Sequence, residues 1–148
     1  MEKKELTNIL SEVLLPVGFK RKGNYWVING EIITKMINLQ KSSFSNSFYI
    51  NYGYILNALP LGNFMMHVNN RVSSLDVEER DRITFLLNLE SDIPDEERTK
   101  ALKEMLQNKL VSKIQSINTE EDLSNELKNR ITLNNIPLVV KRHLHLPE

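Results

Sequence analysis

Residues 18–53 interleave basic, aromatic and amide side chains at the spacing of β-strands, and this mixture could bind a partner. Cations and amides on a sheet can hold phosphates or carboxylates, and aromatic rings can stack on bases or pack against a protein. The residues with this chemistry are Lys20, Lys22, Trp26, Gln40, Lys41 and Ser42, together with Arg71 further along the chain. We expect them to form a recognition surface, which requires that Trp26, Gln40 and Lys41 lie on one exposed face.

The same residues also have a purely structural interpretation. Lysines are common on the edges of sheets, where they prevent strand-to-strand aggregation. Trp26 would then pack in the core, and the amide and hydroxyl groups of Gln40, Ser42 and Ser43 would satisfy local backbone groups at a turn.

The histidines offer little chemistry. His143 and His145 are two residues apart, but no third ligand has a recognisable spacing, so we expect no metal. His67 could act as a general base, with Arg71 and Gln40 holding an anion, in a small hydrolase or nuclease. A single histidine near the end of a strand is more often structural. The chain has no Gly-rich phosphate loop and no nucleophile elbow. We therefore expect no catalytic residues and no cofactor.

The formal charge is zero overall, but it is unevenly distributed. Residues 13–75 hold six basic groups against one acidic group, a net charge of +5, and residues 76–97 hold nine acidic against two basic groups, a net charge of −7. The two segments could neutralise each other within one fold. Alternatively, the basic segment could meet an anionic partner or the acidic segment of a second copy.

Size and composition are those of one globular domain. The chain has 148 residues, with 41% hydrophobic and 26% charged residues, which is enough to form a core. The chain contains no run of 18 apolar residues, so no membrane span is predicted. The chain has no cysteine and no secretory signal pattern, so we expect a cytoplasmic protein.

Periodicity predicts a helix followed by an antiparallel sheet. Apolar residues recur at helical spacing from Leu6 to Leu14, and Pro16 and Gly18 should end that helix. Strands are expected at 19–22 and 24–28. Asn29-Gly30 is a hairpin signal leading into a strand at 31–41. Residues 47–56 alternate with period two, which predicts a strand with one face on the core.

The second half of the chain is expected to be mainly helical. A strand containing His67 is predicted within 61–69, a short turn or helix at 76–81 and a strand at 82–89, although Asp76 could instead cap a helix through the same residues. Helices are expected from Pro94 to about 117 and, after the capping-box sequence Thr119–Asp122, to about Asn129. The final residues, 131–148, are predicted to form a strand at 137–146 or an extended arm.

Several strings in the first half resemble a bacterial family, the domain of unknown function 4304. They are LLPVGFKRKGN followed by Tyr25-Trp26, then NLQKSS at 38–43, FYINYG at 48–53 and Arg71-x-x-x-Leu75. The resemblance covers about residues 10–75 and is loose beyond. Ile83-Thr84-Phe85 stands where the family usually has paired tryptophans. The resemblance implies a fold, with no established activity to transfer.

Together these features predict a single α+β domain: an N-terminal helix, an antiparallel sheet of four or five strands, and C-terminal helices on one face. The expected function is a non-enzymatic binding module for a protein partner, of the immunity or antitoxin kind. The alternatives are single-stranded nucleic-acid binding through Lys20, Lys22, Trp26 and Lys41, and the small hydrolase or nuclease described above. A homo-oligomer is a further alternative.

Overall fold

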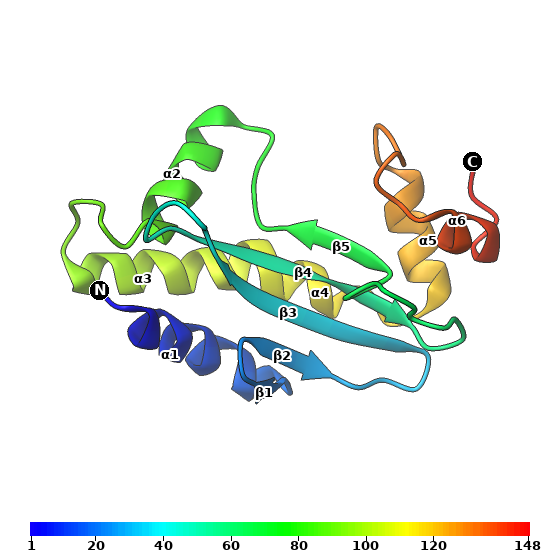
Figure 1. Ribbon diagram of the computed structural model, residues 1–148, viewed down its shortest axis with the longest axis horizontal. Coiled ribbons are helices and arrows are strands. Elements are labelled where there is room, and N and C mark those ends of the chain that lie inside the picture. The colour runs from blue at the N-terminus through cyan, green and yellow to red at the C-terminus, as the bar shows by residue number, and fades with distance from the viewer.

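The computed structural model describes residues 1–148 and places helices against one face of a five-stranded antiparallel sheet (Figure 1). The strands follow one another in chain order, so the sheet is a simple meander. Its strands are β1 Lys20–Lys22, β2 Tyr25–Ile28, β3 Ile33–Lys41, β4 Phe48–Leu56 and β5 Val68–Arg71. The predicted α+β class, with an N-terminal helix and an antiparallel sheet, is confirmed.

The N-terminal helix α1, Lys3–Leu14, forms as the apolar spacing predicts. Leu6, Leu10 and Leu14 are fully buried, because residues four apart fall on the same side of a helix. A single 3₁₀ turn at Leu15–Val17 contains Pro16, and Gly18 then adopts a left-handed conformation with φ 107°. The chain can therefore reverse directly into β1.

The hairpins differ from the predicted ones in one turn. Gly23-Asn24 joins β1 to β2, with Lys22 opposite Tyr25 and a φ of 63° at Gly23. Asn29-Gly30 does not form the next turn, because Ile28 pairs with Lys35 and the register puts the tip at 31–32. The predicted turn is therefore wrong by two residues, and β3 begins at Ile33 rather than at Glu31.

The strand expected within 61–69 is also displaced. His67 precedes β5, which spans Val68–Arg71, and residues 57–67 form the connection from β4. Gly53 allows this strand to approach, since a Cβ atom there would lie 1.8 Å from the carbonyl oxygen of Val68.

Helix α2, Val77–Leu87, occupies the place of the strand expected at 82–89. Asp76 caps it by accepting a hydrogen bond from the backbone N–H of Glu79 at 3.2 Å. The alternative prediction, a helix capped by Asp76 through these residues, is therefore correct. Ile83, Leu86 and Leu87 are buried at helical spacing. The alternation of apolar residues that suggested a strand is therefore a coincidence of this short segment.

A long helix spans the sheet behind its strands (Figure 1). It consists of α3 Asp95–Met105, a π-helical segment at Leu106–Val111 and α4 Ser112–Gln115. Its predicted apolar stripe is confirmed, since Leu102, Leu106, Leu110 and Ile114 are all fully buried.

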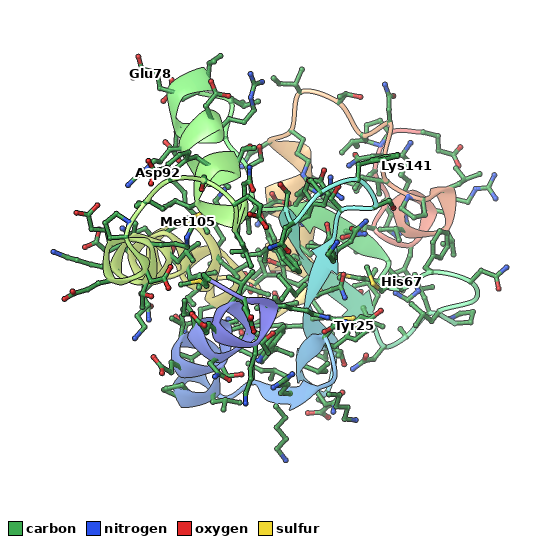
Figure 2. The ribbon with its side chains drawn as sticks, turned by 60° about the vertical axis from the view of Figure 1, so that its left-hand side comes forward. Tyr25, His67, Glu78, Asp92, Met105 and Lys141 are labelled. Atoms are coloured by element: carbon green, nitrogen blue, oxygen red, sulfur yellow. The ribbon has the colours of Figure 1, made fainter.

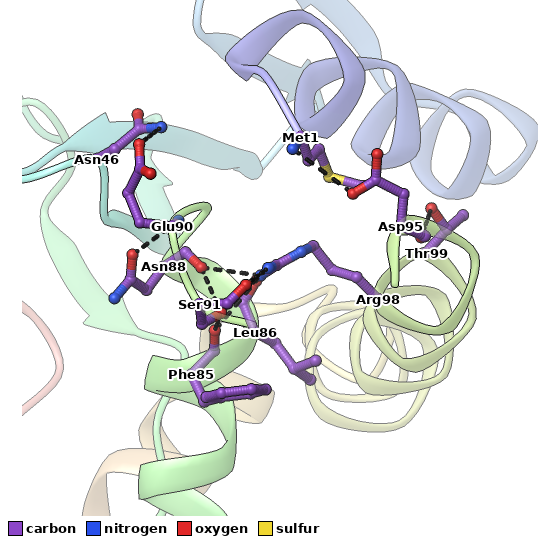
Figure 3. A network of polar contacts seen from close by, with 10 residues as sticks. All are labelled: Met1, Asn46, Phe85, Leu86, Asn88, Glu90, Ser91, Asp95, Arg98 and Thr99. Carbon is purple, nitrogen blue, oxygen red and sulfur yellow. Dashed lines mark hydrogen bonds and ion pairs between the residues drawn. The ribbon is translucent and has the colours of Figure 1, made fainter. Parts of the chain in front are cut away.

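Arg98 fastens α3 to the end of α2 (Figure 3). Its side chain is 1% exposed, and its Nη atoms donate to the carbonyl oxygens of Leu86 at 2.7 Å, Asn88 at 2.9 Å and Ser91 at 2.8 Å. Burial lowers the pKa of Arg98 below its usual value. A guanidinium among carbonyl oxygens at a helix C-terminus satisfies groups that a helix end leaves without partners.

The C-terminal part is helical, not extended. Thr119 and Asp122 form the predicted capping box of α5, Glu120–Lys128. Residues 138–143 then form α6, Leu138–His143, so the strand expected at 137–146 is wrong. Val140 is fully buried and Leu144 and Leu146 join the core, so this segment is not an extended arm either. None of the helices combines the length and apolar character needed to cross a membrane.

Candidate partner-binding face

The sheet has two faces of different character, which the strand register defines. Residues directly opposite each other on neighbouring strands point to the same side. One side, here the covered face, carries Trp26, Ile37, Ile50 and Tyr54, which pack with the helices in a core of 33 buried residues. The other side, here the open face, contributes no side chain to that core.

A single row of five side chains crosses the open face from edge to edge. Pairing places Lys22 opposite Tyr25, Tyr25 opposite Asn38, Asn38 opposite Asn51, and Asn51 opposite Arg71. We call this the central row. It has a cation at each end and polar or aromatic side chains between. A second, more apolar row lies beside it and consists of Lys20, Val27, Met36, Gly53 and Asn69.

The amides of the central row are joined by hydrogen bonds. Asn51 is 5% exposed, and its Nδ2 donates to Asn38 Oδ1 at 3.2 Å and to Gln40 Oε1 at 2.8 Å. Asn38 Nδ2 in turn donates to the carbonyl oxygen of Asn24 at 3.4 Å. Buried amides with defined partners have a fixed orientation, so this part of the face is rigid.

Arg71 completes the amide network at the β5 edge. Its Nε donates to Asn51 Oδ1 and its Nη2 to Gln40 Oε1, both at 3.2 Å. The guanidinium lies over the ring of Tyr49, 4.0 Å from the ring centre. Stacking and hydrogen bonding together hold a planar cation in place while leaving part of it exposed.

The other half of the open face is hollowed and apolar. Met36 and Ile55 form its floor, and Phe64 and Met65 from the β4–β5 connection form one wall of a hollow of about 410 Å³. Tyr25 and Lys22 also line it. The central row therefore borders an apolar depression, an arrangement suited to a side chain that is partly apolar and partly anionic.

The structure brings together only part of the predicted surface. Lys20, Lys22, Gln40 and Arg71 share the open face. Trp26 does not: it points into the core, is fully buried, and donates from Nε1 to Ser11 Oγ at 3.1 Å. The requirement that Trp26, Gln40 and Lys41 lie on one exposed face is therefore not met, so the surface does not exist as predicted. The candidate surface is the open face alone.

Lys41 and Ser42 hold the turn between β3 and β4. Lys41 Nζ donates to the carbonyl oxygen of Ser45 at 3.1 Å, and Ser42 Oγ accepts from the backbone N–H of Phe44 at 3.2 Å. This turn presents the ring of Phe44, which is 98% exposed. Ser42 thus has the local role that the structural interpretation assigned to hydroxyls at this turn, and Lys41 bonds to a backbone carbonyl of the same turn.

His67 is buried, and its ring bonds to backbone groups of the fold. It is 1% exposed; its Nδ1 accepts from the backbone N–H of Leu56 at 2.9 Å, and its Nε2 lies 3.0 Å from the carbonyl oxygen of Pro60. A carbonyl can only accept, so the neutral tautomer with its proton on Nε2 satisfies both contacts. No ring nitrogen is left for a substrate. His143 pairs with Glu120 at 2.9 Å, which ties α6 to α5.

The cations of the open face have no acidic partner. None of the ion pairs involves Lys20, Lys22 or Arg71, and none joins residues 13–75 to residues 76–97. The acidic segment lies elsewhere: Figure 2 shows Glu78 and Asp92 at the α2 end of the molecule, away from Tyr25 on the sheet. The two segments therefore do not neutralise each other through direct contacts.

Sequence reasoning missed two residues of this face, Tyr49 and Asn51. The available signal was the period-two alternation of β4, in which Tyr49 and Asn51 fall opposite the apolar residues. A large polar side chain in the middle of such a strand belongs to a face that is not packed as a core.

Comparison with known proteins identifies the family of the chain. No curated protein and no solved structure matches it. The family model described as Domain of unknown function (DUF4304) matches residues 10–131, which extends the similarity from the sheet through α5. The chain therefore belongs to the DUF4304 family.

Proposed function

We propose that this protein is a non-enzymatic binding module that recognises a protein partner through the open face, as immunity or antitoxin proteins recognise theirs. The observation that carries the proposal is a sheet face outside the core whose cations, Lys20, Lys22 and Arg71, have no acidic partner in the chain. Unpaired charge on a preformed surface favours the docking of a complementary surface.

Two features favour a protein over single-stranded nucleic acid. Apart from Phe64 at the wall of the hollow, the open face has two aromatic rings, Tyr25 and Tyr49, and the guanidinium of Arg71 covers one of them. Base stacking needs accessible rings, and Trp26 is buried. The apolar hollow beside the central row suits an aliphatic side chain.

We place this recognition in the cytoplasm of a bacterium. The absence of cysteine fits a reducing compartment, and the family that the sequence resembles is bacterial. An acidic protein surface is the partner that the charge of the open face requires.

Photo-crosslinking in cells that make the protein tests the proposal. The residue p-benzoylphenylalanine is placed at position 25, where it replaces a tyrosine of similar shape, and in a control chain at position 131, where Ile131 is 93% exposed. We expect one discrete protein adduct from position 25 that is lost on Arg71→Glu. The same adducts from both positions, or an adduct sensitive to nuclease, would contradict the proposal.

A further inference from the structure

We propose that the partner segment on the open face is extended and acidic, and that two of its carboxylates bind the two ends of the central row. One would contact Arg71 on β5 and the other Lys22 on β1. This inference rests on the proposed function and names the chemistry of the partner.

The guanidinium and amide groups left without a partner at the Arg71 end are hydrogen-bond donors. Gln40 Oε1 already accepts from Asn51 and from Arg71, and Asn51 Oδ1 accepts from Arg71. The groups left without a partner are Arg71 Nη1 and Gln40 Nε2, which can only donate. A carboxylate is the protein group that accepts from a planar guanidinium and a neighbouring amide together.

The orientation of these donors is fixed before a partner arrives. Tyr49 supports one side of the guanidinium, and the hydrogen bonds to Asn51 and Gln40 occupy one of its edges. Arg71 as a whole is exposed, and its Nη1 has no partner within the protein. A group held in this way loses little conformational entropy when it binds, which favours affinity.

The Lys22 end is a free cation beside the apolar hollow. Lys22 is exposed on the edge strand, forms no ion pair, and lines the hollow together with Tyr25. The acidic residue nearest in sequence, Glu31, lies at the tip of the β2–β3 hairpin and not on the open face. A carboxylate at this end would therefore meet a positive charge with no competing acid on the same face.

The row sets the spacing of the two carboxylates. Lys22 and Arg71 are separated by four strand-to-strand steps, and at about 4.8 Å a step this is a span of about 19 Å. An extended chain advances about 3.3 Å per residue, so the two acidic residues would be about six positions apart. The side chains between them would contact Tyr25 and the hollow, and we expect these to be apolar.

Two synthetic peptides test this spacing. Both have the same composition, with capped ends and a Ser/Thr/Leu spacer; one has glutamates six positions apart and the other has them adjacent. Each is titrated into the ¹⁵N-labelled protein, and the signals of the Arg71 guanidinium and of the backbone at Lys22 are followed. We expect the spaced peptide to move both signals and to bind about tenfold more tightly than the adjacent one.

Three variants separate the contacts. Arg71→Gln and Lys22→Gln should each weaken the spaced peptide about tenfold. Lys113→Gln removes the same charge from an exposed position on α4 and should change nothing. A peptide with glutamine in place of glutamate should not bind. Equal binding of both peptides, or no effect of Arg71→Gln, overturns the inference.

The experiments distinguish failure of this inference from failure of the proposed function. If position 25 still crosslinks to one protein but neither peptide binds, the open face is a docking surface that does not use paired carboxylates. If a short thymidylate oligonucleotide moves the central-row signals more strongly than the spaced peptide, both the inference and the choice of a protein partner are wrong.

Discussion

Arg98 on α3 donates a hydrogen bond of 2.7 Å to the carbonyl oxygen of Leu86 in the last turn of α2 (Figure 3). With the bonds to Asn88 and Ser91, one guanidinium holds the helix end and the following loop. That loop also supports the sheet, because Leu89 donates from its backbone N–H to the carbonyl oxygen of Asn46. The contact therefore links two helices to the turn that ends β3.

Replacing Arg98 should destabilise the fold strongly. Arg98→Met removes three charge-assisted hydrogen bonds and leaves the buried carbonyl oxygen of Leu86 without a donor. The carbonyl oxygens of Asn88 and Ser91 keep other donors. We expect a loss of about 3 kcal/mol or more in the free energy of unfolding. Arg98→Lys should lose less, because an ammonium can still reach one or two of these carbonyl oxygens. Urea denaturation measures both, with Arg80→Met, an exposed arginine on α2, as the control. Equal stability of Arg98→Met and the control would show that the network contributes nothing.

Gly53 should not tolerate a side chain. Gly53→Ala would place its Cβ 1.8 Å from Val68 O and 2.8 Å from Met66 Sδ, so β5 would have to move away from β4. We expect a loss above about 3 kcal/mol, or no folding at all. Gly23→Ala is the control, since nothing lies within 4 Å of its Cβ and only the left-handed conformation opposes it. That change should cost about 1 kcal/mol. Circular dichroism during thermal unfolding compares the two.

The capping box of α5 should weaken in acid. Backbone hydrogen bonds from Asn118 and Thr119 hold the pKa of Asp122 below its usual 3.8. A carboxyl whose pKa is lower in the folded than in the unfolded protein stabilises the fold when the pH is above its unfolded pKa. This stabilisation is lost as the pH falls through the folded pKa. Stability should therefore fall below pH 3.8, and the fall should be smaller in Asp122→Asn. Melting temperatures from pH 7 to about pH 2.5 test this, with Glu121→Gln as the control. Thr119→Ala should cost about 1 kcal/mol at neutral pH.

Two tyrosines on the covered face should make the fold less stable at high pH. Burial raises the pKa values of Tyr52 and Tyr54 above 10.0. The unfolded chain then loses these protons first, so stability falls as the pH rises above 10. Tyr54→Phe should reduce the fall between pH 10 and 11. A Tyr54→Phe curve that runs parallel to the wild type would contradict this.

The β3–β4 turn should lose its order without Lys41. Lys41→Met removes the bond to the Ser45 carbonyl oxygen, so the backbone around Phe44 should become more mobile on the nanosecond timescale. Amide relaxation measures this, with Lys113→Met as the control. Phe44 is 98% exposed, so Phe44→Ser should leave the melting temperature within about 2 °C of the wild type.

Local signals predicted much of this fold. The apolar spacing of α1, the alternation of β4 and the capping box at Thr119 each reflect interactions between residues close in the chain, so they could be recognised without the rest of the molecule. The candidate site was predicted in part. Lys20, Lys22, Gln40 and Arg71 fall on the face that the structure leaves open.

Tertiary contacts decided the rest. For residues 82–87 the local signals conflicted, since Asp76 can cap a helix and the alternation suggests a strand. Arg98, brought in by α3, satisfies the end of the helix that forms. In β2 both sides of the strand carry apolar or aromatic residues, so alternation could not tell which side meets the helices. Packing of α1 buried Trp26 and left Tyr25 on the other face. Local spacing determines which residues share a side of a strand, but only the packing of distant elements determines which side remains exposed.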